Sequence, residues 1–181
     1  VHVLMAIAVP IIWGLGFAVA KVGLGQIPPM FLMGMRYSLA ALVLIWFAKP
    51  PAGMVGKVFA AATVSGALTY GLVFTGLRDI YASTAILVVQ LQVPFLAVLG
   101  VILLKERMSL RGALGMVLAF GGVLLITGEP RVQENLVPVF TVIAGGLCWA
   151  FGQVMISQLG GSLGGMRLLA WIAVFAAPQL F

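Results

Sequence analysis

Residues 80–104 read IYASTAILVVQLQVPFLAVLGVILL and carry no charged side chain over 25 positions. A helix that crosses a membrane needs about 20 mostly apolar residues, because each residue rises 1.5 Å and the hydrocarbon core is about 30 Å thick. The stretch is long enough for one crossing. Its apolar residues do not alternate with polar ones, which favours a helix over a strand of a membrane barrel.

The rest of the chain has the same character. Of its 181 residues, 63% are hydrophobic and 8% are charged, whereas soluble domains average about 45–50% apolar and about 25% charged residues. This composition excludes a soluble enzyme, a disordered protein and a nucleic-acid binder. The net charge of +6 is the basic excess that membrane proteins keep on their cytoplasmic side.

Other long apolar intervals, all uncharged except 30–48, which is interrupted only by Arg36, predict six more helices, which makes seven in all. They cover residues 3–20, 30–48, 58–77, 112–128 and about 138–158, with a last helix that starts near Leu163. The run 135–166 is too long for a single crossing, and its glycine cluster at 160–165 predicts the break. The last helix reaches Phe181 without a flanking charge, which we interpret as a helix cut short.

The basic residues predict the orientation. Six of the ten Lys and Arg residues fall in the loops 49–57, 105–111 and 159–167, and three fall in the loops on the opposite side. The positive-inside rule therefore places the first group of loops, and the N-terminus, in the cytoplasm.

An internal repeat appears at an offset of 136 positions, where residues 12–16 (IWGLG) align with residues 148–152 (CWAFG). Five predicted helices separate the two copies, so the second copy enters the membrane from the opposite side, as in the inverted repeats of many transporters. We therefore predict an all-α polytopic membrane bundle with a first five-helix repeat at 1–129. Residues 138–181 would start the second repeat, giving seven of ten helices.

Two motifs resemble a known family. WGLGF at 13–17, followed by Pro28, Pro29 and Arg36, resembles the opening of the EamA branch of the drug/metabolite transporter superfamily. KERMSLRG at 105–112 and the glycines that follow it resemble that family's corner between the fourth and fifth helices. The resemblance implies a ten-helix carrier of the bacterial inner membrane with its N-terminus inside. Its nearest likeness is to exporters of cysteine and O-acetylserine, and many members export amino acids or other small metabolites.

Arg36 is the only charge well inside a predicted span. A charge costs about 2.5–3.5 kcal/mol at the centre of a membrane helix and less near its end. Arg36 therefore either pairs with a substrate carboxylate or a gate residue, or is a structural arginine that snorkels to the interface.

The fourth span has Gln90 and Gln92 near its middle, and Pro94 follows. Proline cannot donate to the carbonyl four residues back, so the Gln90 carbonyl is predicted to be freed at mid-membrane. Either a neighbouring helix or a wet cavity would satisfy these groups.

Aromatic side chains form the remaining candidates. Tyr70 and Phe74 share a helix face, and Gln153 follows Trp149 by one turn. Such aromatics either pack the bundle or form an amphipathic cavity wall. The predicted substrate-binding set is Trp13, Arg36, Tyr70, Phe74, Gln90, Gln92, Trp149 and Gln153, and the predicted hinges are Pro10 and Pro94.

These features predict a secondary transporter that exports a small metabolite, an amino acid or a derivative, by alternating access. A multidrug exporter and a non-transporting seven-helix protein are the alternatives; the first is disfavoured because all four acids fall at helix ends or in loops. No enzyme activity, metal, cofactor or nucleic acid is expected. The expected partners are a small-molecule substrate and the lipid bilayer, and a homodimer is left open.

Overall fold

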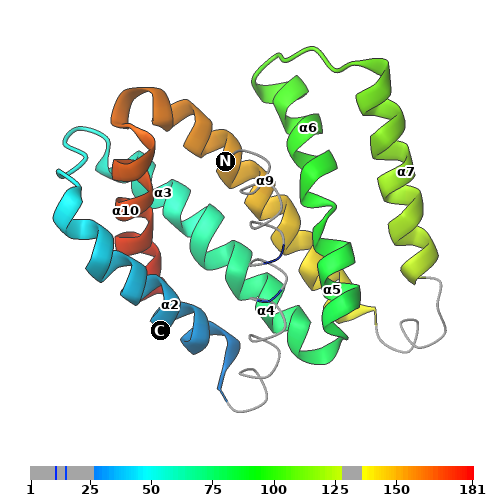
Figure 1. The fold of residues 1–181 in the computed structure, drawn as a ribbon, viewed down its shortest axis with the longest axis horizontal. Coiled ribbons are helices and arrows are strands. Elements are labelled where there is room, and N and C mark those ends of the chain that lie inside the picture. The colour runs from blue at the N-terminus through cyan, green and yellow to red at the C-terminus, as the bar shows by residue number, and fades with distance from the viewer. Residues whose placement is uncertain (1–10, 12–14, 16–26, 128–135) are drawn as a thin grey trace.

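The computed structural model describes residues 11, 15, 27–127 and 136–181, and these residues form helices joined by short turns (Figure 1). Four helical segments are long and apolar enough to cross a membrane: Met30–Phe47, Val55–Asp79, Ala82–Leu103 and Val137–Leu163. The prediction of an all-α polytopic membrane bundle is confirmed. The predicted first helix at 3–20, with Pro10 and Trp13, lies outside the described residues.

The helices follow the predicted spans closely. In chain order they are α2 (Pro29–Leu44) with the 3-10 turn Ile45–Phe47, α3 (Val55–Ala62), the π-helical turn η2 (Thr63–Leu68), α4 (Thr69–Asp79), α5 (Ala82–Val89), α6 (Gln92–Leu103), α7 (Leu110–Thr127), α9 (Val137–Leu163), and α10 (Gly165–Ala176) with the 3-10 turn Ala177–Gln179. Helix α9 extends five residues beyond the predicted end at 158, and it stops at Gly164, whose φ of 76° is left-handed.

The fourth span is interrupted between α5 and α6, at Gln90 and Leu91. The Val93 amide donates to the Gln90 carbonyl at 3.1 Å. The prediction that this carbonyl is freed is therefore wrong, because a tighter turn supplies the donor that Pro94 lacks. The hinge role of Pro94 stays a prediction.

Helix α9 lies against the α3–α4 span at the centre of the molecule (Figure 1). Glycines on both sides bring the backbones close: a Cβ at Gly76 would lie 2.6 Å from the Pro138 carbonyl oxygen, and one at Gly152 would lie 2.5 Å from the Ser65 Cβ. In a membrane the hydrophobic effect does not drive helices together. Small residues at such crossings let the helices associate through close van der Waals packing.

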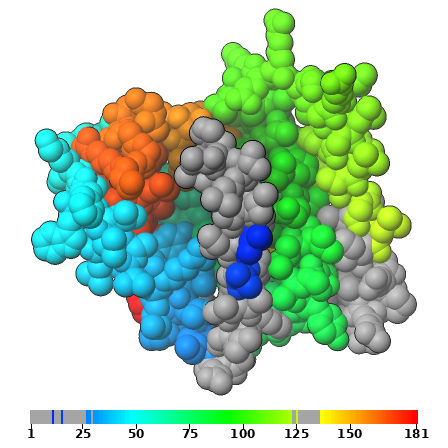
Figure 2. Space-filling model, viewed as in Figure 1, coloured from blue at the N-terminus to red at the C-terminus, as the bar shows by residue number. Residues whose placement is uncertain are grey.

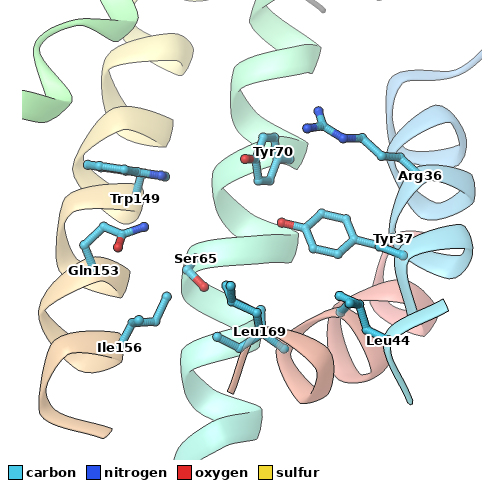
Figure 3. Close-up of a pocket in the computed structure, with 12 residues that line it drawn as sticks. Arg36, Tyr37, Leu44, Ser65, Tyr70, Trp149, Gln153, Ile156 and Leu169 are labelled. Atoms are coloured by element: carbon cyan, nitrogen blue, oxygen red, sulfur yellow. The ribbon is translucent and has the colours of Figure 1, made fainter. Parts of the chain in front are cut away.

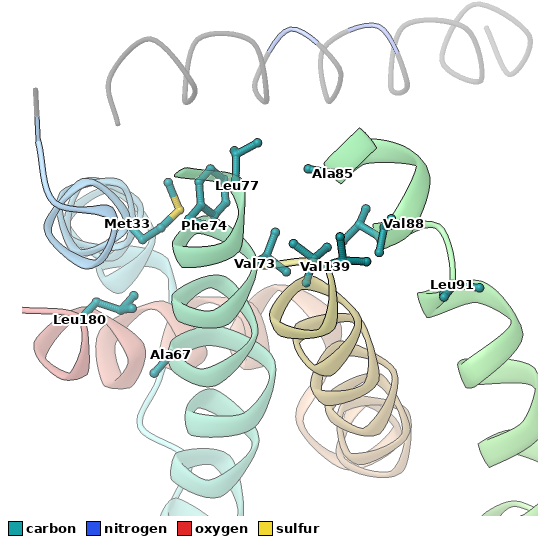
Figure 4. Close-up of a cluster of buried hydrophobic side chains, with 12 residues drawn as sticks. Met33, Ala67, Val73, Phe74, Leu77, Ala85, Val88, Leu91, Val139 and Leu180 are labelled. Carbon is teal, nitrogen blue, oxygen red and sulfur yellow. The ribbon is translucent and has the colours of Figure 1, made fainter. Parts of the chain in front are cut away.

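The apolar core lies beside this crossing (Figure 4). Phe74 and Leu77 of α4 pack with Val88 of α5, Val139 of α9 and Met33 of α2, all of them buried. A second buried cluster joins α3, the end of α9 and α10. Helix α7 lies at the edge of the molecule (Figure 2), and its Leu114 and Leu118 are exposed, as expected for a surface that faces lipid.

Candidate functional site

A cavity of about 300 Å³ opens between α2, the α3–η2–α4 span, α9 and α10 (Figure 3). Twelve residues line it: Arg36, Tyr37, Ala40, Leu44, Ser65, Tyr70, Trp149, Gln153, Ile156, Leu169, Ile172 and Ala173. Every lining residue belongs to a described helix, so the shape of the cavity is determined by helix packing and not by loops.

Helix α2 contributes the charge. Arg36 lies seven residues after Pro29, which is about two helical turns into the span. Its guanidinium carbon lies 5.7 Å from the centre of the Tyr70 ring, a distance at which a cation is attracted to an aromatic face. The Tyr37 and Tyr70 rings meet edge to face at 5.6 Å. The cation is thereby held at the cavity wall by an aromatic pair.

The π-helical turn η2 places Ser65 in the same wall. A π turn adds a residue to one helical turn and is frequent at functional sites. The Ser65 hydroxyl donates to the Ala61 carbonyl at 2.6 Å, and the Thr69 hydroxyl donates to the Val64 carbonyl at 2.8 Å. The Ser65 oxygen therefore keeps its acceptor capacity toward the cavity while its proton is used within the helix.

Helix α9 forms the opposite wall. Trp149, Gln153 and Ile156 follow one another at helical spacing, so they share one face. In Figure 3 the Trp149 indole and the Gln153 amide point from α9 toward the α3–α4 span. The indole supplies one N–H donor near the level of Tyr70, and the amide supplies two N–H donors and an acceptor one turn further along, near the level of Tyr37 (Figure 3).

The two ends of the cavity differ in chemistry. Arg36, Tyr70 and Trp149 lie at one end, and Leu44, Ile156 and Leu169 lie at the other (Figure 3). A molecule bound here would have its charged group at the first end and its apolar part at the second.

Four of the predicted site residues line the cavity together: Arg36, Tyr70, Trp149 and Gln153. Other predicted residues lie elsewhere. Phe74 is buried in the core, Gln92 is buried where α6 meets Gly146, Gln90 is exposed, and Trp13 lies outside the described residues. Substrate binding by any of the eight stays a prediction.

Sequence reasoning missed several lining residues, above all Tyr37 and Ser65. Tyr37 could have been found from the sequence because it follows Arg36 directly. Nothing comparable marks Ser65, because its position depends on the π turn, for which the sequence carries no pattern.

The electrostatics of the cavity are simple. Among the described residues that line it, Arg36 alone is charged. Among the described residues no carboxylate lines the cavity, and the two described acids, Asp79 and Glu106, lie at a helix end and in a turn. The site therefore offers a positive charge without a countercharge from the described part of the chain.

Helices long and apolar enough to cross a membrane, packed around a cavity with one described cation and several hydrogen-bonding groups, define a polytopic helical membrane protein. Comparison with known proteins gives the family. Residues 1–128 match the EamA-like transporter family. The chain belongs to this family.

Individual relatives of the chain are also named as transporters or efflux pumps. The chain is 32% identical over 177 residues to a protein of Salmonella typhimurium named "Probable amino-acid metabolite efflux pump", covering 94% of this chain and 59% of that protein. It is 28% identical over 153 residues to an Escherichia coli protein of the same name, covering 83% of this chain and 51% of that protein. A Bacillus subtilis protein named "Uncharacterized transporter YoaV" is 26% identical over 189 residues, covering 96% of this chain and 63% of that protein.

The chain thus spans between about half and three fifths of the length of these relatives. No solved structure matches it.

Proposed function

We propose that this protein exports a small amino acid or amino-acid derivative across the bacterial inner membrane by alternating access, with its N-terminus in the cytoplasm. The observation that carries the proposal is the cavity between the apolar helices, in which Arg36 is the one charged residue of the described lining. Membership of the EamA-like transporter family and the names of the two enterobacterial relatives support the direction and the substrate class.

The size of the cavity supports a small substrate. Its volume of about 300 Å³ corresponds to about ten water molecules at about 30 Å³ each. That space is sufficient for a molecule the size of a single amino acid.

The charge of the cavity supports a carboxylate ligand. A guanidinium binds a carboxylate through two parallel N–H···O bonds, and the interaction is strong where water is scarce. A cationic drug would have to approach Arg36 without an acid among the described lining residues to offset the repulsion. We therefore favour an amino-acid exporter over an exporter of cationic compounds.

The inverted repeat extends the proposal to the whole protein. A second complete five-helix copy would bring the full length to about 280–300 residues, because each copy takes about 136 positions. Determining the complete gene sequence checks this expectation, and a full-length product without further spans would contradict the ten-helix architecture.

Transport is tested with the full-length product of the gene. Cells that overproduce it are loaded with a panel of isotope-labelled amino acids, and the loss of each from the cytoplasm is followed. We expect faster loss of at least one neutral amino acid than in cells with empty vector. Efflux of dye cations without efflux of any amino acid would overturn the proposal in favour of the multidrug alternative.

Arg36 variants identify the binding group. Arg36→Ala should abolish efflux while the amount of protein in the membrane stays normal, and Arg36→Lys should keep part of it, because a compact ammonium lacks the bidentate fork. Arg107→Ala is the matched control, since Arg107 is exposed in the turn between α6 and α7. Normal efflux by Arg36→Ala would return Arg36 to the structural interpretation.

A further inference from the structure

Helices α2 and α10 begin at equivalent positions of the predicted repeat. Helix α2 begins at Pro29 and α10 begins at Gly165, which is the same offset of 136 positions that aligns residues 12–16 with residues 148–152. Between residues 29–44 and 165–180 this offset gives five identities: Met30 with Met166, Leu32 with Leu168, Ala40 with Ala176, Ala41 with Ala177 and Leu44 with Leu180. Helix α10 is therefore the counterpart of α2 in the second copy of the predicted repeat.

The two helices run antiparallel and pack against each other (Figure 1). At one end of the pair, the Arg167 Nε near the start of α10 donates to the carbonyl of Lys49, which follows α2, at 2.8 Å. At the other end, the rings of Phe31 and Phe181 meet edge to face with their centres 5.3 Å apart. Equivalent helices that run in opposite directions are expected of an inverted repeat, which exchanges the two sides of the membrane. Equivalent residues of α2 and α10 should therefore lie toward opposite ends of a site that the two helices share.

The cavity contains two such equivalent pairs. At the offset of 136 positions Arg36 corresponds to Ile172 and Tyr37 corresponds to Ala173, and all four residues line the cavity. A symmetric site would carry a cation and a phenol at both ends. Here α10 has an isoleucine and an alanine in their place, so the two helices supply different chemistry to the same cavity.

The α10 pair belongs to the apolar end of the cavity. Ile172 follows Leu169 by about one helical turn on the same face, and Figure 3 places Leu169 at the end that holds Leu44 and Ile156. Ile172 is also part of the buried cluster that joins α3, the end of α9 and α10. Ile172 and Ala173 are 5% and 4% exposed, so the shape of this end is fixed by packing.

The middle of the cavity can take the ammonium group of an amino acid. The Ser65 hydroxyl keeps its acceptor capacity and the Gln153 amide supplies a carbonyl oxygen, and both lie between the two ends (Figure 3). With its carboxylate at Arg36, an amino acid held in this way would extend its side chain toward Ile172. A side chain with an amide or a carboxylate would lose its water there without gaining a partner from the described residues of that end, whereas an apolar side chain is transferred favourably.

We propose that Ile172 and Ala173 form the side-chain subsite of the cavity. Because they replace the second cation and phenol of a symmetric site, they select amino acids with an apolar side chain over those with a polar or acidic one. The alternative is that the apolar end only packs the helices and contacts no ligand. The subsite rests on the proposed function for its use in export, but ligand binding measures it without transport.

The first test compares three ligands of nearly the same shape. Leucine, asparagine and aspartate have side chains of similar branched outline that end in two methyl groups, an amide and a carboxylate. Full-length protein is purified in detergent, and the rise of its Tm with ligand concentration gives the Kd of each ligand. We expect leucine to bind roughly 100-fold more tightly than asparagine, the scale on which an apolar pocket discriminates against a polar isostere, and aspartate to bind more weakly still. Similar Kd values for leucine and aspartate would overturn the subsite.

Two substitutions change the subsite independently. Ile172→Gln supplies an amide, so the ratio of leucine to asparagine affinity should move roughly tenfold toward asparagine, through one gained hydrogen bond and lost apolar contact. Ala173→Val fills part of the subsite, so leucine should bind roughly tenfold more weakly while the amino acid alanine binds as before. Ala173→Val also keeps the proposal testable if Ile172→Gln does not fold.

Matched controls carry the same substitutions outside the cavity. Ile102→Gln lies on α6 at a position that is 64% exposed, and Ala119→Val lies at an exposed position of α7. Both should keep the parental Kd values. Parental Kd values in folded Ile172→Gln and Ala173→Val would show that the α10 pair does not contact the ligand, and would overturn the subsite.

The second test separates the subsite from the proposed function. Efflux of the same isotope-labelled amino acids is measured from cells that overproduce the full-length parent or Ala173→Val. We expect the parent to export leucine faster than asparagine or aspartate, and Ala173→Val to lose most of its leucine efflux relative to alanine efflux. Leucine binding without efflux of any amino acid would contradict the proposed export and leave the subsite supported. Efflux of asparagine and aspartate as fast as that of leucine would overturn the subsite and leave export supported.

Discussion

The glycines of α9 and those of α7 lie in different surroundings. In α9, Gly145 and Gly152 lie directly against the α3–α4 span, where an added Cβ would approach Val73 or Ser65 to within 2.6 Å. In α7, an added Cβ at Gly115, Gly121 or Gly122 would meet nothing within 4 Å in the described part of the chain. The same residue type therefore marks a tight helix crossing in one span and an open surface in the other.

The cavity is found on the side of the tight crossing. Close approach of α9 brings Trp149 and Gln153 into the same cavity as Tyr70 and Arg36. The α7 side presents Leu114, Val117 and Leu118, which are all more than half exposed and purely apolar. Close packing of α9 on the α3–α4 span thus forms the site, and α7 offers an apolar surface suited to lipid or to another helix.

The largest expected effect comes from the core beside the crossing. Phe74→Ala should lower the free energy of unfolding by about 3–5 kcal/mol, because it deletes a fully packed ring. Leu118→Ala is the control, since Leu118 is 76% exposed and should cost little. Thermal unfolding in detergent measures both. Equal losses of stability in the two variants would contradict the difference in packing between the α4 core and the exposed α7 surface.

The crossing itself is tested by enlarging its glycines. Gly152→Leu should force α9 away from Ser65 and cost about 1–3 kcal/mol of stability, the usual scale of overpacking. Efflux should fall with it, because Gln153 and Trp149 move with the helix. Gly115→Leu on α7 should leave both unchanged. A stable, active Gly152→Leu variant would show that α9 does not pack as closely as described.

A smaller effect is expected from the polar groups of the cavity. Gln153→Leu keeps the side chain's size and removes one donor and one acceptor, and a single hydrogen bond is worth about 1 kcal/mol net. We expect the KM for efflux to rise about fivefold, with unchanged thermal stability. Gln90→Leu, at an exposed position in the break between α5 and α6, is the matched control. A raised KM in Gln90→Leu together with an unchanged KM in Gln153→Leu would place the binding site in the fourth span instead.

The variant expected to have the smallest effect tests which end of the helix bundle faces the cytoplasm. Ser109→Cys, in the Cys148→Ser background, places a thiol in the turn between α6 and α7. We expect unchanged transport and a stability loss of at most about 1 kcal/mol, because the Ser109 hydroxyl accepts a hydrogen bond from the Gly112 amide at 3.2 Å. An impermeant maleimide should label it in inside-out vesicles and not in intact cells. Ready labelling from outside would contradict the predicted topology.

The sequence by itself determined the helices. The spans at 30–48, 58–77, 80–104 and 112–128 appear within a few residues of their predicted bounds, because the length of an uncharged apolar run is a local property that the bilayer thickness selects. The four cavity residues Arg36, Tyr70, Trp149 and Gln153 were also identifiable, since polar or amphipathic side chains inside a span are costly and stand out.

Only the tertiary structure decided which of these residues face one another. In a soluble helix an apolar stripe reveals the buried face, but in a membrane the surrounding lipid is as apolar as the protein interior. Nothing in the local pattern therefore separates Tyr70, on the cavity wall, from Phe74 in the core, or Gln153 from the exposed Gln90. The rotation of each helix follows from the glycine contacts between α9 and the α3–α4 span, and from the π turn that directs Ser65 into the cavity.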